Sequence, residues 1–327
     1  MTSTTKSDKK KRKRSSVRHT RAIQIDRQKR ALADNLPEHV EQLFKEIVHP
    51  LTLAQSELFR QMGLRERTLT LPVMMALFLM ALWRQVAGVC DLVRLTRDEA
   101  AIWEMPQKVT QQAVSTRLKV LPAQLVLNVL NGLLPQMQSR WTSRERPLPP
   151  EVAWAQAHYK TCLIVDGSTL DALVRKVGLL RDQEKHPLAG KMTALLHLGS
   201  QMPHTIWYNA KATANDQTFW SQIVDAVPDG CLLIFDLGYT NFAQFKALTD
   251  KGVTFLTRAK SNLKIERVRH LAITPTFRDT IVWIGTDETR QQVRLIEVLY
   301  KTKWQRYITN ELDADILPAR ACVALYY

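Results

Sequence analysis

The chain has 327 residues, long enough for two or three domains, and its 45% hydrophobic and 24% charged residues are ordinary for a globular protein. Its formal net charge of +15 favours a polyanionic partner. The four cysteines lie too far apart for a metal-binding motif, which argues against a cysteine-ligated zinc site and favours reduced core cysteines in the cytoplasm.

A basic, disordered arm is expected at the start of the chain, over residues 1–35. Residues 1–30 hold twelve Lys or Arg residues and two Asp residues. The consecutive basic residues are Lys9, Lys10, Lys11, Arg12, Lys13 and Arg14. Such a run predicts an arm that binds the phosphates of a polyanion, and the alternative is a solubilising tail. No apolar stretch follows the run, so a signal peptide is not indicated.

Residues 36–142 are expected to form a helical, DNA-binding domain. The most apolar stretch, residues 71–83, is too short to span a bilayer, so it predicts a buried helix and no membrane partner. Thr96 followed by Glu99 predicts a capping box that opens a helix.

The segment 109–122 has the pattern of an amphipathic helix that Thr110 would cap. Its apolar residues fall on one face, which leaves Arg117 and Lys119 to point elsewhere. We expect these two residues to contact DNA, as in the reading helix of a helix-turn-helix motif. The alternative is an ordinary amphipathic surface helix.

Charge and proline at residues 143–156 predict a linker to a second domain that spans residues 157–327. The elements predicted there are strands 161–166, 191–198 and 204–210, helix 215–227, strand 231–236, helix 240–252 and strand 253–259. The continuous apolar run at 231–236 predicts a central strand covered on both faces. A meander followed by helix crossovers predicts an α/β, ribonuclease-H-like fold.

Asp166 and Asp236 each end an apolar strand of this domain. A carboxylate in that position is costly unless it is paired or bound to metal, and two of them side by side repel without a cation. Mg²⁺, with Mn²⁺ as the alternative, suits such an oxygen site. Two ions about 3.5–4 Å apart would stabilise the attacking and leaving oxygens of a phosphoryl displacement. The alternative is that each Asp is a turn residue at a strand end.

The motifs IVDGSTL, FDLGYTNF, FLTRAKSN and YITNELD resemble those of DDE transposases of insertion-sequence family four, over about residues 40–327. The resemblance implies that Asp166 and Asp236 are the first two catalytic acids and metal ligands, and that Arg258 and Lys260 lie near the DNA backbone. It also implies a mostly β insertion at about residues 262–312. The implied protein is a bacterial, cytoplasmic and nucleoid-associated homodimer that moves an insertion sequence by acting on its terminal repeats and on target DNA.

In that family a third acid, a Glu, lies in a helix that begins Tyr-x-x-Arg, but this sequence stops at Tyr326 and Tyr327. The internal acids interpreted as structural or solvated are Glu297, Glu311, Asp313 and Asp315. No residue of this chain is therefore assigned as the third acid. We expect a truncated transposase that is inactive in strand transfer and prone to association.

Two other hypotheses remain. The chain is a non-catalytic, DNA-binding remnant that occupies element ends or forms mixed oligomers with intact transposase. Alternatively, it is a ribonuclease-H-like nuclease whose metal site is completed by a different residue.

Overall fold

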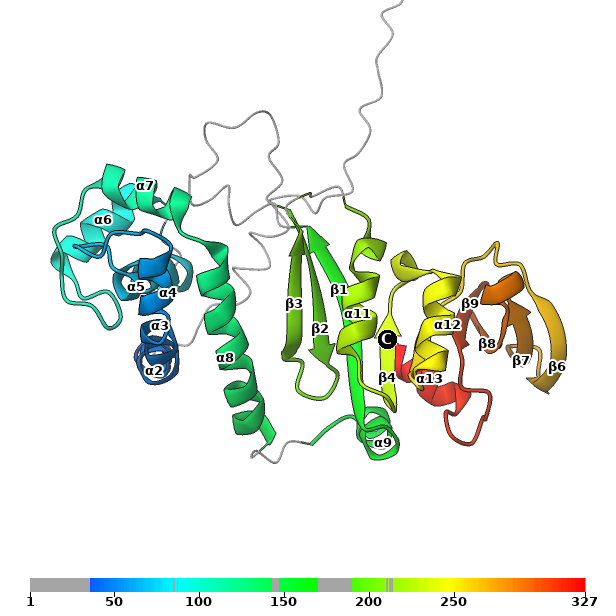
Figure 1. Cartoon of the computed structure of the whole chain (residues 1–327). Helices are drawn as coiled ribbons and strands as arrows, with labels where there is room; N and C mark the ends of the chain where they lie inside the picture. The colour runs from blue at the N-terminus through cyan, green and yellow to red at the C-terminus, as the bar shows by residue number, and fades with distance from the viewer. Residues whose placement is uncertain are drawn as a thin grey trace, which may run out of the picture.

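The computed structural model describes residues 36–84, 86, 88–142, 147–169, 190–209, 211 and 214–326. The predicted arm residues Lys9, Lys10, Lys11, Arg12, Lys13 and Arg14 lie outside the described residues, as does Tyr327. Within the described residues, a group of helices comes first, and a large sheet with helices on its faces follows (Figure 1).

The first part of the described chain is helical. Its elements are α2 (Leu36–Leu43), η1 (Phe44–Val48), α3 (His49–Leu53), α4 (Ser56–Gln61), α5 (Leu71–Trp83), α6 (Val89–Asp98), α7 (Gln111–Val120) and α8 (Ala123–Thr142). Helix α5 is the predicted buried helix, and seven of its 13 residues are buried. Thr70 begins it by accepting a hydrogen bond from the Val73 amide, and Pro72 occupies the first turn, where no amide hydrogen is needed.

The two predicted caps in this part have different outcomes. Thr110 caps α7 as predicted, because its hydroxyl accepts a hydrogen bond from the Ala113 amide at 3.2 Å. The prediction at Thr96 is wrong, because α6 already begins at residue 89 and Thr96 lies inside its last turns. There the buried Thr96 hydroxyl donates to the Val93 carbonyl at 3.0 Å instead of opening a new helix.

Helix α8 packs against the helical part on one side and contacts the sheet on the other. It runs beside β3 (Pro203–Asn209), and the Ser200 hydroxyl next to that strand donates to Gln138 Oε1 at 3.2 Å (Figure 1). None of the described helices is by itself both long and apolar enough to cross a membrane. Helices α7 and α8 meet that test only as a pair, which is bent by 74°.

The second part is built on one sheet that has nine strands among the described residues. Besides β3, they are β1 (Thr161–Thr169), β2 (Lys191–His197), β4 (Cys231–Phe235), β5 (Thr254–Arg258), β6 (Glu266–Ile273), β7 (Phe277–Ile284), β8 (Gln291–Tyr300) and β9 (Lys303–Thr309). Their order across the sheet is β3-β2-β1-β4-β5-β9-β8-β7-β6. Strands β1, β2 and β3 are antiparallel neighbours, whereas β4 lies parallel between β1 and β5.

The order of elements agrees with the prediction for residues 161–258. Three strands are followed by η2 (Asp216–Phe219) and α11 (Trp220–Ala226), then β4, then η3 (Leu237–Tyr239) and α12 (Phe242–Asp250), then β5. Part of the expected linker forms a further helix, α9 (Pro150–His158), whose Ala155 is fully buried against the sheet.

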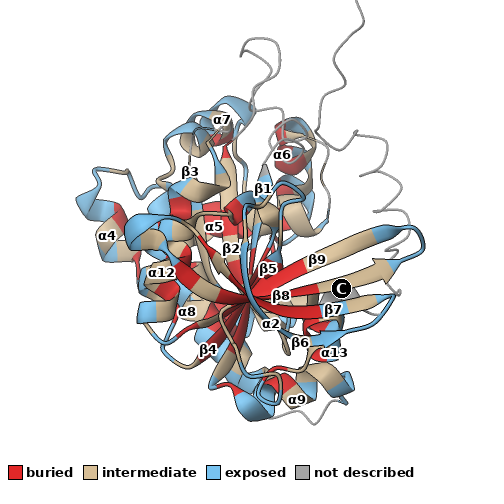
Figure 2. Ribbon diagram, turned by 90° about the vertical axis from the view of Figure 1, so that its right-hand side faces the viewer, coloured by how far each residue is buried: buried red, intermediate tan, exposed pale blue. Residues whose placement is uncertain are grey.

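Helices cover both faces of the central strands. All five residues of β4 are buried, as the apolar run predicted (Figure 2). Alternate residues of β4 enter two different cores: Leu233 and Phe235 pack with α11 and α12, whereas Leu232 and Ile234 pack with α9 and α13 (Ala319–Tyr326). Successive side chains of β4 therefore point to opposite faces of the sheet.

The predicted β-rich region at about residues 262–312 contains β6 to β9 and η4 (Asp287–Thr289). These strands form an antiparallel meander, and β9 also pairs with β5, with Leu256 opposite Thr309. The region therefore extends the main sheet instead of forming a separate one. Strand β6 lies at the edge, and its register against β7 shifts twice.

A buried ion pair joins this region to α13. The Arg294 side chain is fully buried, and its Nε and Nη2 donate to the two carboxylate oxygens of Asp279 at 2.8 and 2.6 Å. Its Nη1 donates to the Leu317 carbonyl at 2.6 Å and to the Asp313 carbonyl at 3.3 Å. Strand β8 thus holds the loop that leads into α13.

Candidate active site

Asp166 and Asp236 lie where the parallel pairing of β1 with β4 ends. Asp236 directly follows β4, but β1 continues past Asp166 to Thr169 in antiparallel pairing with β2, so the prediction that Asp166 ends its strand is wrong. Val165 of β1 is opposite Phe235 of β4, so Asp166 and Asp236 come next at equivalent positions. Neighbouring strands are about 4.8 Å apart, a separation at which two carboxylates can reach the same ion. The structure therefore brings Asp166 and Asp236 together from positions that are 70 residues apart in the sequence.

Both aspartates lie toward the sheet face that α13 covers. Cys162 and Ile164 of β1 pack in the core with α13, and Asp166 follows them at the same alternation. On this face the Tyr326 hydroxyl of α13 donates a hydrogen bond to Asp236 Oδ1 at 3.2 Å. Burial, followed by the charge of Asp236, raises the pKa of Tyr326, so this hydroxyl stays protonated at neutral pH.

Each carboxylate uses one oxygen within the chain. Asp166 Oδ1 accepts a hydrogen bond from the Gly167 amide at 2.8 Å, and Asp236 Oδ1 accepts one from the Leu237 amide at 2.6 Å. Within the described part of the chain, no hydrogen bond or ion pair involves Oδ2 of either residue, and both residues are exposed. Two open carboxylate oxygens at one edge fit a hard divalent cation.

Among the described residues, two carboxylates lie at this edge. Among the residues that the structure describes, no group of three His, Cys, Asp or Glu side chains is arranged to hold a metal ion. Water and phosphate oxygens can complete the coordination of a single Mg²⁺ ion beside two carboxylates. The described side chains alone therefore fit one ion better than two.

A buried tyrosine lies near the two aspartates, on the other face of the sheet. Tyr239 is 2% exposed, and its hydroxyl lies 3.2 Å from Thr193 Oγ1. Burial raises the pKa of Tyr239 to about 12, while the hydrogen bond with Thr193 opposes the shift. The negative charges of Asp216, Asp166 and Asp236 raise it further, in agreement with three carboxylates close to one hydroxyl.

Positive charge lies beside the carboxylates at the end of β5. Phe235 of β4 is opposite Thr257, so Arg258 follows in line with Asp236. Arg258 is exposed, and its Nη2 donates to Gln305 Oε1 at 2.6 Å. Lys260, two residues further along, is also exposed. The strand ends therefore present two carboxylates next to two cations.

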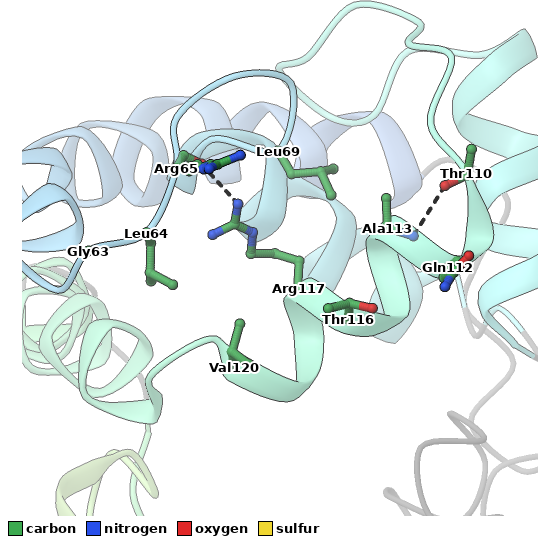
Figure 3. Close-up of a pocket in the computed structure, with 10 residues that line it drawn as sticks. All are labelled: Gly63, Leu64, Arg65, Leu69, Thr110, Gln112, Ala113, Thr116, Arg117 and Val120. Atoms are coloured by element: carbon green, nitrogen blue, oxygen red, sulfur yellow. Dashed lines mark hydrogen bonds between the residues drawn. The ribbon is translucent and has the colours of Figure 1, made fainter.

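The other two predicted DNA-binding residues, Arg117 and Lys119, lie in the helical part, apart from the aspartates (Figure 1). Arg117 lines a cavity of about 580 Å³ between α7 and the loop before α5 (Figure 3). Its Nη2 donates to the Arg65 carbonyl at 2.9 Å, and its guanidinium carbon lies 5.8 Å from the centre of the Phe59 ring. Arg117 is thus partly engaged in holding the loop, whereas Lys119 is exposed.

Of the internal acids that were interpreted as structural or solvated, Glu297, Glu311 and Asp313 use their carboxylates in contacts typical of a structural role, and Asp315 is exposed. Glu297 Oε1 lies 3.0 Å from Arg306 Nε on the neighbouring strand. Glu311 Oε1 accepts a hydrogen bond from the Asp313 amide at 3.0 Å, and Asp313 Oδ1 accepts one from the Asp315 amide at 2.8 Å. These carboxylates stabilise a strand pair and a turn.

Two residues near the site were not predicted from the sequence. Lys191 Nζ and Asp216 Oδ1 form an ion pair of 2.5 Å, and the Asp216 carboxylate lies next to Gly167 and Gly238. A glycine follows each of the two aspartates within two positions, and this pattern indicates that another group packs closely against the backbone there. It does not indicate which side chain fills the space.

The comparisons with known proteins agree with this geometry. No curated protein matches the sequence. The family model described as "Transposase DDE domain" matches residues 159–326, which is more than half of the chain and includes every strand of the sheet. Proteins of this family act on DNA and generally use divalent metal ions. The chain therefore belongs to the transposase family that carries a DDE domain.

Proposed function

We propose that this chain is a DNA transposase in which Asp166 and Asp236 bind a divalent cation for phosphoryl transfer. The observation that carries the proposal is the register of β1 and β4, since it gives two exposed carboxylates equivalent positions where the parallel pairing of these strands ends. Mg²⁺ is the expected ion and Mn²⁺ the alternative, because both prefer oxygen ligands. The active form is proposed to be a homodimer on the terminal repeats of an insertion sequence.

The proposal includes a ribonuclease-H-like core at residues 157–327 with a β insertion at about 262–312. The antiparallel unit β3-β2-β1 beside the parallel strands β4 and β5 supports this assignment. Residues 36–142 would bind DNA, residues 143–156 would connect the two parts, and residues 1–35 would add a basic arm.

The chemistry follows from the side chains at the strand ends. A divalent ion would polarise the phosphate and lower the pKa of a bound water molecule. Asp166 and Asp236 would hold that ion through oxygens that are open within the described residues. Arg258 and Lys260 would bind the neighbouring DNA backbone, where guanidinium and ammonium groups position phosphates without reading sequence.

A second function, DNA binding without catalysis, is favoured by the two-membered ligand set. The described residues contain no group of three potential metal-binding side chains, so a second ion would lack a charged anchor from this part of the chain. In that case the chain would bind the ends of the insertion sequence or form mixed oligomers with intact transposase, and either would inhibit the intact transposase.

Nicking of a supercoiled plasmid tests the proposed chemistry. We expect the full chain to nick the plasmid when Mg²⁺ or Mn²⁺ is present and not when EDTA is present. Asp166→Asn and Asp236→Asn should each abolish nicking while DNA binding persists, because the amide keeps the shape and loses the charge. Asp229→Asn is the matched control, since Asp229 pairs with Lys160 at the opposite ends of β1 and β4. Unchanged nicking by Asp236→Asn would exclude the catalytic role, and DNA binding without nicking would favour the second function.

The salt dependence of DNA binding tests the basic residues. Each phosphate contact that is lost should reduce the slope of log K against log salt by roughly 1. Deletion of residues 1–35 should therefore flatten the slope by several units if Lys9 to Arg14 contact phosphates. Lys119→Ala should reduce it by about 1, whereas Arg117→Ala should also loosen the loop that Arg117 holds.

A further inference from the structure

Asp216 fills the space beside the two glycines that follow the proposed metal ligands. A Cβ atom added at Gly167 would lie 2.7 Å from Asp216 Oδ1, and one added at Gly238 would lie 3.1 Å from Asp216 Oδ2. At Gly238, the Asp216 carboxylate supplies all the described atoms within 4 Å of that position. One carboxylate therefore packs against both backbone segments that carry Asp166 and Asp236, which are the last part of β1 and the turn after β4.

Lys191 of β2 fixes the position of this carboxylate. Its Nζ lies 2.5 Å from Asp216 Oδ1 and donates to the Ala214 carbonyl at 3.1 Å. The two paired side chains are 12% and 30% exposed, so the pair is largely shielded from water. Lys191 is two positions along β2 from Thr193, which is paired with Gly167. The ion pair is thus anchored to the sheet itself.

The segment that carries Asp216 is also attached to the turn after β4 by other contacts. Gln217 Nε2 donates to the Thr240 carbonyl at 3.0 Å, and Trp220 Nε1 donates to the Tyr239 carbonyl at 3.1 Å. These hydrogen bonds do not involve the Asp216 carboxylate. Loss of its charge should therefore leave η2 and α11 packed on the sheet, and its effect can be measured in a folded chain.

Asp216 lies on the opposite face of the sheet from the one toward which Asp166 and Asp236 point. Side chains alternate along β1, so the Cβ position of Gly167 faces the core that contains Tyr239, whereas Asp166 faces the side of α13. Asp216 is therefore not in position to share an ion with Asp166 and Asp236. It supports the backbone from which they project.

We propose that Asp216, held by Lys191, is a positioning residue that sets the orientation of the Asp166 and Asp236 carboxylates for cation binding. The inference rests on the proposed function, because it assumes that these two carboxylates bind the ion. Residues that orient metal ligands from outside the coordination sphere commonly change metal affinity by about 10–100-fold when they are replaced.

The sign of the effect separates positioning from simple electrostatics. If the ion pair acted only through charge, Lys191→Met would leave Asp216 negative and tighten cation binding at the nearby carboxylates. Asp216→Asn would leave Lys191 positive and weaken it. If the pair positions the two backbone segments, both substitutions weaken cation binding, because both release the carboxylate or amide from its place.

Binding of Mn²⁺ to the full chain, followed by electron paramagnetic resonance, provides the test. We expect Asp216→Asn and Lys191→Met each to weaken Mn²⁺ binding about tenfold or more. Asp229→Asn, which removes the exposed ion pair at the other ends of the same strands, should leave binding unchanged. Tighter binding by Lys191→Met, or unchanged binding by either variant, would overturn the proposal. Failure of Asp166→Asn and Asp236→Asn to weaken binding would instead overturn the proposed function.

Two further measurements keep the inference testable without catalysis. In metal-free chain, amides of residues 166–168 and 236–239 should exchange hydrogen faster in Asp216→Asn and Lys191→Met than in the unmodified chain, and equal exchange would refute positioning. Gly238→Ala should weaken Mn²⁺ binding, because its Cβ would lie 3.1 Å from Asp216 Oδ2 and the carboxylate would have to shift by a few tenths of an ångström. In an Asp216→Ala background the same substitution should have no further effect, and an additive loss would contradict the proposed contact.

Discussion

Replacing Asp279 with Asn should strongly destabilise the chain, because Arg294 then remains buried without its counter-charge. The Arg294 side chain is 0% exposed and that of Asp279 is 5% exposed, and contacts of 2.8 and 2.6 Å join them. Removal of one partner from such a pair costs about 3–5 kcal/mol. A typical domain has only about 5–15 kcal/mol of unfolding free energy, so the loss would be a large share of it.

A double variant, Asp279→Leu with Arg294→Met, separates the charge from the hydrogen bonds. Removing both buried charges is often neutral or stabilising by about 1–4 kcal/mol. Here the Leu317 carbonyl also loses its donor, whereas the Asp313 carbonyl keeps the Leu317 amide at 3.2 Å, and an unsatisfied buried acceptor costs about 1–3 kcal/mol. The double variant should therefore be more stable than Asp279→Asn, while the amides of α13 exchange hydrogen faster because their loop has lost its anchor.

Urea unfolding followed by tryptophan fluorescence measures these free energies. The control is Asp250→Asn, which breaks the i,i+4 pair with Lys246 on the surface of α12, where the side chains are 37% and 59% exposed. Such a pair contributes about 0.3–0.5 kcal/mol. If Asp279→Asn lowers the unfolding free energy no more than Asp250→Asn does, the reasoning about the buried pair is refuted.

Other predictions concern reactivity, pH and helix capping. Cys90 should react with a thiol reagent in the folded chain, whereas the three buried cysteines should react only after unfolding, because burial raises their pKa to about 12. Mass spectrometry of the labelled chain measures this, and labelling of all four cysteines at the same rate in the folded chain would refute it. Burial lowers the pKa of His197 and His204 from 6.5, so the folded state resists their protonation and stability should fall as pH drops below 6.5. Unfolding curves above and below that pH should show a smaller loss in His204→Gln, and an equal loss would remove these histidines as the cause. Thr110→Ala should cost about 1 kcal/mol in urea unfolding, because the Ala113 amide loses its acceptor, and no change would mean that water replaces the cap.

The central strands could be predicted because their composition leaves few alternatives. The run CLLIF is short, continuous and apolar, and all five of its residues are buried in β4. Its position also set where the following Asp236 would lie, since a strand that is buried on both faces must expose its polar residue at its end. The same reasoning placed Asp166 beside Asp236, although β1 continues to Thr169 and Asp166 therefore does not end its strand.

Contacts between distant segments could not be predicted in the same way. The sequence NDQTF indicates a cap at Asn215, and that cap is present, but nothing in it indicates that Asp216 pairs with Lys191. Likewise, the composition of β9 predicts a strand and does not reveal that Thr309 lies opposite Leu256 of β5. Thr96 was assigned to a helix start because a capping box and the last turn of a helix can share the same residue types.

The pairing of β5 with β9 also has a consequence for the order in which the chain assembles on the ribosome. Arg258 at the end of β5 lies opposite Tyr307, which is synthesised after the whole meander β6–β8. Domains fold from the N-terminal side as they emerge. The edge of β5 that faces β9 therefore has no hydrogen-bonding partner until β9 has left the exit tunnel. The segments around Asp236 and Arg258 accordingly reach their native positions late, after the preceding helices have folded.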